Sequence, residues 1–505
     1  MDVMEGNVSL LFPVVLPVAA GIAVLLHKGF WQSRKRLMAA VLGTLLLEAV
    51  LVLLALAGGG RLLLWQLAKG VPLLLAVDGV SCLFAFLTAA VWLLVGIYSV
   101  SYMKHEQEER RFFGFYLIVL GVLVGLDFSA NLVTMYIFYE LMTLTSLPLV
   151  LHERTKEAVA AGLKYLFYSV AGAFLALFGI FFLLEACGSQ AFTPGGVMAG
   201  APGQEGLFLA AVFCILAGFG AKAGMFPLHG WLPTAHPVAP APASAVLSGV
   251  ITKSGVLAVL RVVYYVVGPQ ALRGTWVQHV WILLTLLTVF MGSMLAYKEP
   301  VLKKRLAYST VSQVSYVLFG LSMLQPQAFV GALAHVVFHS LIKNALFLCA
   351  GAVIVATGST RVAQMRGLGE RMPLLLGCYT AASLALVGIP PLSGFISKWY
   401  LCLGALASGT GAWAWLGPVV LLVSALLTAG YLLPLTIQGF FPGAEARQKE
   451  EGEETAEVLE GRPGKIKVSA WMTAPVFVLA LGALWFGCFP GALIAMLEKI
   501  ASGVL

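Results

Sequence analysis

Five charged side chains stand inside long apolar stretches of the sequence: Glu140, Lys222, Lys253, Lys343 and Lys398. A charge near the centre of a lipid bilayer costs about 3 kcal/mol on insertion scales, and such groups persist where they are paired, hydrated and functional. Burial disfavours the charged form of a lysine, so that a buried lysine can take up and release protons. Structural ion pairs are the alternative, but five such groups along one chain favour a path for protons or cations.

A second polar feature is regular in its spacing. His335, His339 and Lys343 follow one another at intervals of four residues, and side chains at that interval lie on one face of an α-helix. Because histidine titrates near neutral pH, this stripe is suited to line a hydrated path. The two histidines could instead bind a metal ion, but no nearby cysteine or carboxylate completes a tetrahedral site.

Proline and glycine interrupt two of the apolar stretches. Five prolines fall between residues 222 and 250: Pro227, Pro233, Pro237, Pro240 and Pro242. A second interruption, Gly388-Ile389-Pro390-Pro391, ends seven residues before Lys398. Proline removes a helical hydrogen bond, and in lipid the freed groups must be satisfied by protein or water. Two broken helices, each with a lysine and one in each half of the chain, are typical of inverted-repeat transporters with sites near the midplane.

The elements that would hold these residues are transmembrane helices. Of the 505 residues, 60% are hydrophobic and 11% charged, and the mean hydropathy is +0.94, whereas soluble domains are about a quarter charged. Since about 20 apolar residues span a bilayer, we predict an all-α bundle of about fourteen spans: 10–26, 38–57, 76–101, 113–127, 131–151, 158–185, 207–227, 243–267, 276–296, 306–323, 327–356, 373–409, 414–440 and 471–490. The interrupted helices are the seventh and twelfth. An odd number of helices per repeat reverses its orientation, which predicts two inverted five-helix repeats, spans 4–8 and 9–13.

The basic residues predict the orientation of these spans. Of the 31 Lys and Arg residues, 21 lie in one alternating set of loops, 4 in the other set and 6 within spans. Positive residues favour the cytoplasmic side, so we expect a multi-pass protein of the cell membrane with both termini outside. Lys164, Arg261 and Glu185 lie near span ends, where we expect them to reach the interface. Glu48 has no evident partner.

Several other classes of function are disfavoured. The net charge of +8 does not indicate nucleic-acid binding, because the charges sit in loops between apolar runs. The seven cysteines are scattered without a CxxC pair, and no Gly-rich nucleotide or flavin motif is evident. We therefore expect no cofactor and no metal in this chain. The N-terminus lacks the basic start of a signal peptide, and the glutamate-rich segment 441–470 is expected to be a solvated cytoplasmic loop.

These motifs together resemble those of the antiporter-like membrane subunits shared by respiratory complex I, Mrp-type Na⁺/H⁺ antiporters and membrane-bound hydrogenases. The resemblance covers roughly residues 113–440 and rests on five stretches in the order of that family: Phe138 to Met142, Gly220 to Pro233, Leu247 to Lys253, His335 to Lys343 and Pro390 to Lys398. The second and the last are long and specific. Lysine at position 398, where some members carry glutamate, is most similar to the D-type component of Mrp antiporters or to their hydrogenase relatives.

The resemblance implies a role for each buried group. Glu140 of the fifth span would pair with Lys222 of the broken seventh span, and Lys253 would stand at the middle of a proton path. His335, His339 and Lys343 would continue this path to Lys398, its terminal group. The resemblance also implies an N-terminal region at 1–112, a proton-conducting core at 113–440, the loop 441–470 and a last helix within 471–505.

The sequence thus predicts a proton or Na⁺/H⁺ translocating subunit of a multi-subunit membrane pump or antiporter. Its partners would be other membrane subunits, the lipid bilayer, H⁺ and possibly Na⁺, and no nucleic acid. An enzyme name such as NADH dehydrogenase would describe the whole complex, since no redox chemistry is evident in this chain. A stand-alone secondary transporter and a quinone-reactive membrane subunit are the alternatives.

Overall fold

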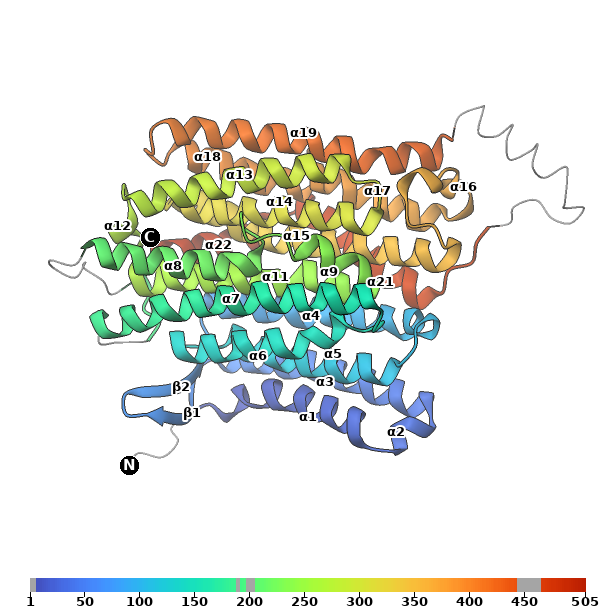
Figure 1. Ribbon diagram of the computed structural model, residues 1–505, viewed down its shortest axis with the longest axis horizontal. Helices are drawn as coiled ribbons and strands as arrows, with labels where there is room; N and C mark the ends of the chain where they lie inside the picture. Colours follow the sequence, from blue (N-terminus) through green and yellow to red (C-terminus); the bar gives the residue numbers. More distant parts are fainter. Residues whose placement is uncertain (1–5, 188–190, 197–204, 443–464) are drawn as a thin grey trace, which may run out of the picture.

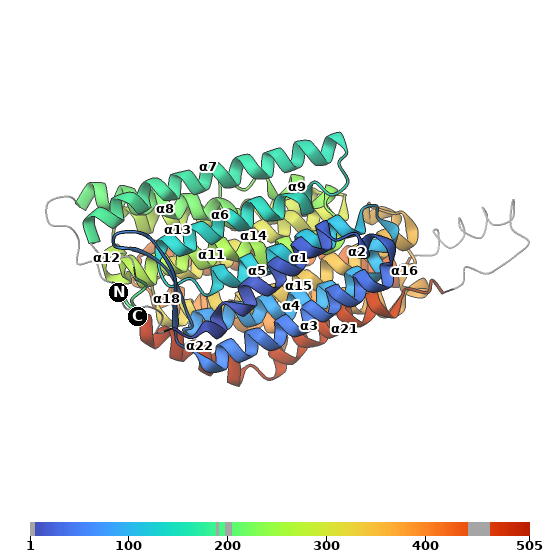
Figure 2. The same ribbon diagram turned by 90° about the horizontal axis from the view of Figure 1, so that it is seen from below.

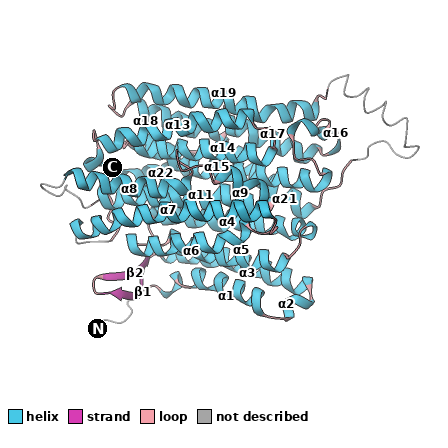
Figure 3. Cartoon of the chain, viewed as in Figure 1, coloured by secondary structure: helices cyan, strands magenta, loops and turns pink. Residues whose placement is uncertain are grey.

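The chain folds into a bundle of long, nearly parallel helices with one small β-hairpin. The computed structural model describes residues 6–187, 191–196, 205–442 and 465–505. The helices run along the long axis of the molecule, and their connections gather at the two ends (Figure 1). Figure 3 shows the hairpin as the single pair of strands in the part of the chain that is described.

The N-terminal third holds two long helices, the hairpin and then three more long helices, with short helical turns between some of them. In chain order these elements are η1 (Val8–Leu10), α1 (Phe12–Leu26), α2 (Gly29–Gln32), α3 (Arg34–Gly58), β1 (Arg61–Ala68), β2 (Val71–Ala76), α4 (Gly79–Tyr102), η2 (Met103–His105), α5 (Glu109–Asp127) and α6 (Leu132–Val150). The strands pair antiparallel, with Arg61 opposite Ala76 and the turn at Gly70. We had expected a plain loop at 58–75, because only apolar runs long enough to span a bilayer were considered.

The middle of the chain contains the first broken helix and two π-helical segments. Its elements are α7 (Lys156–Cys187), α8 (Glu205–Ala223), α9 (Leu232–Val238), α10 (Ala241–Val246), η3 (Leu247–Ile251), α11 (Thr252–Arg261), η4 (Val262–Val267), α12 (Pro269–Leu272), α13 (Trp276–Lys298) and α14 (Leu302–Ser322). The run from α10 to η4 is entirely buried within the bundle.

The C-terminal part contains the second broken helix. Its elements are α15 (Pro326–Thr357), η5 (Val362–Gln364), α16 (Leu368–Arg371), α17 (Pro373–Val387), α18 (Ser393–Leu406), α19 (Ala412–Phe440), α21 (Ala470–Cys488) and α22 (Gly491–Val504). The final helix, α22, was not predicted. The predicted loop 441–470 falls largely on residues outside those described.

Within the described residues, 11 helical segments are long and apolar enough to cross a membrane. They coincide with eleven of the predicted spans, and α5, α14 and the α17–α18 pair occupy the places of the other three. α5 begins with Glu109, Arg110 and Arg111, and α14 begins with basic residues and continues with serine, threonine and glutamine. Their polar character explains why composition alone does not select them. The chain is a multi-pass membrane protein.

Both predicted helix breaks are present. α8 ends at Ala223, and the non-helical segment that follows contains Pro227, whereas Pro233 lies in the first turn of α9 and so begins a helix instead of breaking one. α17 ends at Val387, and Pro390 and Pro391 lie in the short segment before α18. Proline is well tolerated in the first turn of a helix, where its missing N–H has no helical partner to lose.

Both ends of the described chain lie at one end of the bundle in both views (Figures 1 and 2), and α19 ends and α21 begins at the other end (Figure 1). The central helices α11, α14 and α15 are buried among the others. Peripheral helices expose apolar side chains, among them Phe167, Phe174, Phe178 and Phe181 of α7. An apolar periphery around a polar interior is the arrangement expected of a membrane-embedded bundle.

Candidate functional site

The first buried lysine, Lys222, lies in the last turn of α8, beside the first helix break. It is fully buried, and its Nζ donates hydrogen bonds to three hydroxyl oxygens: Thr143 Oγ1 at 3.0 Å, Tyr165 OH at 2.7 Å and Ser169 Oγ at 3.1 Å. The ammonium also lies 4.3 Å from the centre of the Tyr165 ring. A cation near a helix C-terminus is favoured by the helix dipole. Neutral hydroxyls and a ring face thus hold Lys222.

We predicted an ion pair between Lys222 and Glu140, but in the described part of the chain these two residues form none. Glu140 is partly buried, and its Oε1 has no hydrogen-bond partner. The two charges still act on each other through space. Thr143, about one turn further along α6, takes the place that we expected for the carboxylate. The prediction of a direct pair was wrong. A sequence motif identifies the helix that Lys222 faces, but it does not show which residue along that helix the ammonium contacts.

Lys253 lies at the start of α11 and contacts the histidine stripe directly. Its Nζ is 2.6 Å from His339 Nδ1 and donates a second hydrogen bond to the Ser248 carbonyl of the π-helical segment η3. Both Lys253 and His339 are buried. A π-helical segment is often found at functional sites, and here its carbonyl helps to orient the lysine toward α15.

The stripe on α15 is present as predicted. The rings of His335 and His339 stack with centroids 5.8 Å apart. Lys343, one turn beyond His339, points to α14, where Nζ donates to the Leu306 carbonyl at 3.0 Å. The three residues of the stripe therefore differ in their described contacts. The two histidines contact other titratable groups, whereas Lys343 bonds to a backbone carbonyl.

The other end of the stripe leads to Lys398. His335 Nδ1 is 2.9 Å from the hydroxyl of Ser397, the residue before Lys398. The ring of Tyr316 stacks on His335 at 5.4 Å and lies 5.5 Å from Lys398 Nζ. Lys253, His339, His335 and Lys398 thus form one connected series across α11, α15 and α18, which we call the central row.

Lys398 is held by the second helix break. Its Nζ donates to the carbonyls of Leu386 and Val387, both at 2.7 Å. These carbonyls belong to the last turn of α17, where helical partners are missing. Lys222 also lies at the C-terminal end of the first half of a broken helix, so the two breaks place a lysine ammonium in comparable surroundings.

Several polar atoms around the central row have no protein partner in the described residues. They are fully buried side-chain atoms of α15: His335 Nε2, His339 Nε2, Ser340 Oγ and Asn344 Oδ1. Buried polar groups nearly always have a hydrogen-bond partner in protein or water. These atoms therefore offer water molecules places to bind beside the row.

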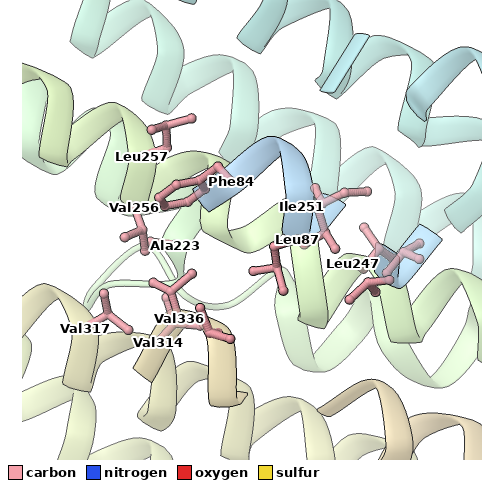
Figure 4. Close-up of a cluster of buried hydrophobic side chains, with 14 of the residues drawn as sticks. Phe84, Leu87, Ala223, Leu247, Ile251, Val256, Leu257, Val314, Val317 and Val336 are labelled. Carbon is pink, nitrogen blue, oxygen red and sulfur yellow. The ribbon is translucent and has the colours of Figure 1, made fainter. Parts of the chain in front are cut away.

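Apolar side chains surround the polar series. Figure 4 shows Ala223, Ile251 and Val336, which lie next to or near Lys222, Lys253 and His335 in the sequence, within one buried hydrophobic cluster. An apolar environment strengthens the electrostatic interaction between neighbouring charges. A proton added to one member of the row therefore has a strong electrostatic effect on the charge state of the next member.

Other polar residues differ from expectation or were missed in the sequence. Arg261 does not reach the interface, as we had expected, but is buried and paired with Asp78 at 2.5 Å. Glu48 is buried with both carboxylate oxygens unpartnered. Asp127 and Lys303 are also buried and were missed. Asp127 is the last residue of the predicted span 113–127, and Lys303 was counted with the loop before the span 306–323. No group of three or more His, Cys, Asp or Glu side chains in the described segments could hold a metal ion.

The fold and the central row define a class, namely polytopic membrane proteins with a series of titratable groups buried across the bundle. Residues 129–428 match the family described as "NADH:quinone oxidoreductase/Mrp antiporter, TM", and residues 68–113 match "NADH-Ubiquinone oxidoreductase (complex I), chain 5 N-terminus". The chain belongs to the NADH:quinone oxidoreductase/Mrp antiporter family of membrane subunits.

Similar proteins include members from two kinds of complex. The N component of the NADH-quinone oxidoreductase of Desulforudis audaxviator is 33% identical over 455 residues, covering 87% of this chain and 85% of the relative. The D component of the Na⁺/H⁺ antiporter of Bacillus subtilis is 30% identical over 459 residues, covering 90% and 91%. A chain of the Mrp complex from Dietzia sp. superimposes with a TM-score of 0.81 and 25% identity over 98% of this chain and 97% of that one. The predicted family is confirmed, and the chain is a membrane subunit of that class.

Proposed function

We propose that this chain carries protons across the membrane as one subunit of a multi-subunit pump or antiporter. The observation that supports this most strongly is the central row. Lys253 contacts His339 at 2.6 Å, and the rings of His339 and His335 stack with centroids 5.8 Å apart. The ring of Tyr316 stacks on His335 and lies 5.5 Å from Lys398 Nζ. Each member can bind and release a proton, and together they link the two broken-helix halves of the bundle.

The transfer begins at Lys222. A neighbouring subunit that changes the charge or position of Glu140 alters the field at the Lys222 ammonium, because the two groups interact through space. The proton released by Lys222 passes through water to Lys253, and from there to His339, His335 and Lys398. Sites this close titrate as a coupled set and not one at a time, so one uptake event drives release at the far end.

The chemistry of the row favours H⁺ over Na⁺ as the ion that it carries. Sodium requires oxygen ligands, as other hard cations do, whereas the row consists of ammonium and imidazole groups. Any Na⁺ that the parent complex moves would follow another route. Glu140 is the single carboxylate among the residues to which we assign translocation: Glu140, Lys222, Lys253, His335, His339, Lys343 and Lys398.

The proposal extends to topology and partners. We place fourteen spans in the cell membrane, with five-helix inverted repeats at spans 4–8 and 9–13 and both termini on the outer side. The excess of basic residues in one set of loops and the common position of the termini support this orientation. The partners would be further membrane subunits and the lipid bilayer. The chain would hold no redox cofactor, so that any electron-transfer chemistry belongs to other subunits.

The test begins with the native complex, purified in mild detergent. Its subunits are identified and its iron and flavin are assayed. Iron–sulfur or nickel subunits would assign the chain to a respiratory or hydrogenase complex, and a set of small membrane subunits without redox centres to an antiporter. Transport by the purified chain alone would contradict the multi-subunit proposal and support a stand-alone transporter.

The row itself is tested in everted membrane vesicles containing the complex. Lys222→Ala and Lys253→Ala should each reduce proton translocation at least tenfold while the complex still assembles. Lys164→Ala is the matched control, because Lys164 lies in a span on α7 but outside the row, and it should retain translocation. Wild-type translocation in the assembled Lys253→Ala complex would refute the proposed path.

A further inference from the structure

An open groove of about 250 Å³ lies between α17 and α21. Its lining residues fall within 373–381 of α17 and 477–484 of α21, and all of them are apolar. We call this feature the α17–α21 groove. Both helices begin at the same end of the bundle, where the Ile466 N–H donates to the Arg371 carbonyl at 3.0 Å. The short helix α16, which leads into α17, lies at the end of the bundle opposite the termini (Figure 1).

The groove is a recess in the apolar periphery of the bundle. The large side chains of Leu374, Phe477 and Leu481 are exposed along it. Two smaller lining residues, Cys378 and Ala480, are buried. Exposed apolar side chains of a membrane-embedded helix contact either lipid tails, which are as apolar as leucine, or another helix. An apolar chain could therefore lie in this recess.

The length of the groove matches the depth of one lipid leaflet. Its α17 wall begins at Pro373, the first residue of the helix, and ends at Ala381. Eight residues of helix cover about 12 Å, and one leaflet is half of a hydrocarbon core about 30 Å thick. Beyond Ala381 on the same half-helix, the Val387 carbonyl accepts a hydrogen bond from Lys398. The groove therefore lies along the half-helix that holds the last member of the central row.

Positive charge gathers at the end of the groove where both helices begin. Arg371 precedes Pro373 by two residues, and the hydrogen bond from Ile466 to its carbonyl brings Lys465 and Lys467 beside it. All three cationic side chains are exposed, and none forms an ion pair with another described residue. Residues 366–373 and 465–470 together carry four positive charges and one negative charge. The groove thus joins an apolar recess to a basic cluster.

We propose that the α17–α21 groove binds one anionic phospholipid. The phosphate contacts Arg371, Lys465 and Lys467, and one acyl chain lies in the groove. Basic sites between transmembrane helices on the cytoplasmic side bind anionic lipid headgroups, and arginine binds phosphate through two parallel hydrogen bonds. A zwitterionic phospholipid carries an ammonium group of its own, which these cations repel. The inference goes beyond the proposed function, because it concerns no residue of the proton path.

The test compares two photoreactive lipids, phosphatidylglycerol and phosphatidylcholine, each with a diazirine on one acyl chain. Each is added to phosphatidylcholine vesicles that contain the full complex, and the labelled peptides are identified by mass spectrometry after illumination. Peptides of α17 and α21 should be labelled at least fivefold more by phosphatidylglycerol. Peptides of α7, whose exposed phenylalanines have no basic cluster of this kind, should be labelled equally by both. Equal labelling of α17 and α21 would overturn the proposal, as would a lack of labelling, which would show that another subunit covers the groove.

The basic cluster is tested by the double variant Arg371→Gln/Lys467→Gln. Both side chains are exposed, so the complex should assemble, and the preference of α17 and α21 for phosphatidylglycerol should fall to less than twofold. Lys298→Gln is the control, because Lys298 is an exposed cation at the end of α13, a helix that does not line the groove. It should keep the wild-type preference. An undiminished preference in the double variant would show that these cations do not select the lipid.

The apolar part of the site is tested by filling it. Gly377 lines the groove, and a Cβ added there meets nothing within 4 Å, so the side chain of Gly377→Leu would occupy the space of the acyl chain without displacing protein atoms. Labelling of α17 and α21 by phosphatidylglycerol should fall at least fivefold. Gly43→Leu is the matched control, because Gly43 of α3 also faces open space, and it should label as wild type. Wild-type labelling in Gly377→Leu would overturn the proposed position of the acyl chain.

Discussion

Lys253 Nζ and His339 Nδ1 lie 2.6 Å apart in the interior of the bundle, and this contact joins α11 to α15. Both groups are buried, and in the proposed path this contact is one proton-transfer step. Removing the imidazole interrupts the series, so we predict that His339→Ala lowers proton translocation at least tenfold. The measurement is acidification of everted vesicles by the assembled complex.

The matched control for that step is His279→Ala, since His279 lies near the start of α13, outside the central row. It should translocate at the wild-type rate. If His339→Ala and His279→Ala behave alike, the contact between Lys253 and His339 has no part in transport.

A second prediction concerns the three hydroxyl groups that accept hydrogen bonds from Lys222, which we call the hydroxyl cage: those of Thr143, Tyr165 and Ser169. Tyr165→Phe removes the acceptor at 2.7 Å from Nζ and keeps the ring, and the loss of one buried hydrogen bond to a charged group amounts to about 1.5–3 kcal/mol. The protonated lysine becomes less favourable, so we expect translocation to slow roughly tenfold and its pH optimum to move to lower pH.

Thr145→Ala is the control for the cage, because the Thr145 hydroxyl bonds only to backbone carbonyls of its own helix. An unchanged pH profile in Tyr165→Phe would show that the hydroxyls do not set the protonation of Lys222.

Glu140 gives a third prediction, since its carboxylate acts on Lys222 without touching it. Glu140→Gln removes the charge that acts on Lys222. It breaks no ion pair in the described part of the chain, because Glu140 forms none there. Coupled translocation should therefore fall at least tenfold while the melting temperature of the purified complex stays within a few degrees. A large fall in melting temperature would instead indicate a structural carboxylate.

Most of the scaffold could be predicted from the sequence because the signals for it are local. Apolar length located the spans, and proline and glycine located both breaks, including the one that frees the Leu386 and Val387 carbonyls for Lys398. Spacing alone placed His335 and His339 on one face. These features depend on residues within one helix or its immediate ends.

What sequence could not supply was contact between helices. Nothing local distinguishes Thr143 from Glu140 as the neighbour of Lys222, or assigns Asp78 to Arg261 across 183 positions. Lys343 continues the helical stripe in spacing, yet it turns to a carbonyl of α14. The hairpin and α22 were missed because neither is a long apolar run.

The Asp78–Arg261 pair makes stability depend on pH in a defined direction. Burial raises the pKa of Asp78, but the charge and hydrogen bonds of Arg261 outweigh this and hold it below its ordinary value of 3.8. A lowered carboxyl pKa contributes stability at neutral pH that is lost as pH falls through the ordinary value toward the folded one. Asp78→Asn should thus melt at lower temperature than wild type at pH 7, with a difference that shrinks below about pH 4.

Melting of the purified complex between pH 7 and pH 3 measures this difference. Glu498→Gln on the exposed face of α22 is the control and should track wild type throughout. A difference that stays constant down to pH 3 would show that ionisation of Asp78 is not its source.

The fifth prediction concerns the close approach of α11 to α8 at Gly255, two residues beyond Lys253. A Cβ at position 255 would lie 2.7 Å from the Phe219 carbonyl oxygen, 2.8 Å from the Ala223 nitrogen and 3.1 Å from Lys222 Cβ. Backbone atoms cannot yield as a flexible side chain does, so Gly255→Ala must move one helix, and overpacking of this kind costs about 1–3 kcal/mol.

That displacement would also carry Lys253 away from His339, so Gly255→Ala should lower both the melting temperature and the rate of translocation. Gly43→Ala is the control, because a Cβ there meets nothing within 4 Å and alanine is the better helix former by about 1 kcal/mol. Should Gly255→Ala melt and translocate as Gly43→Ala does, the packing of α11 against α8 does not position the lysines, and the contact between Lys253 and His339 must be maintained by α15 and η3 alone.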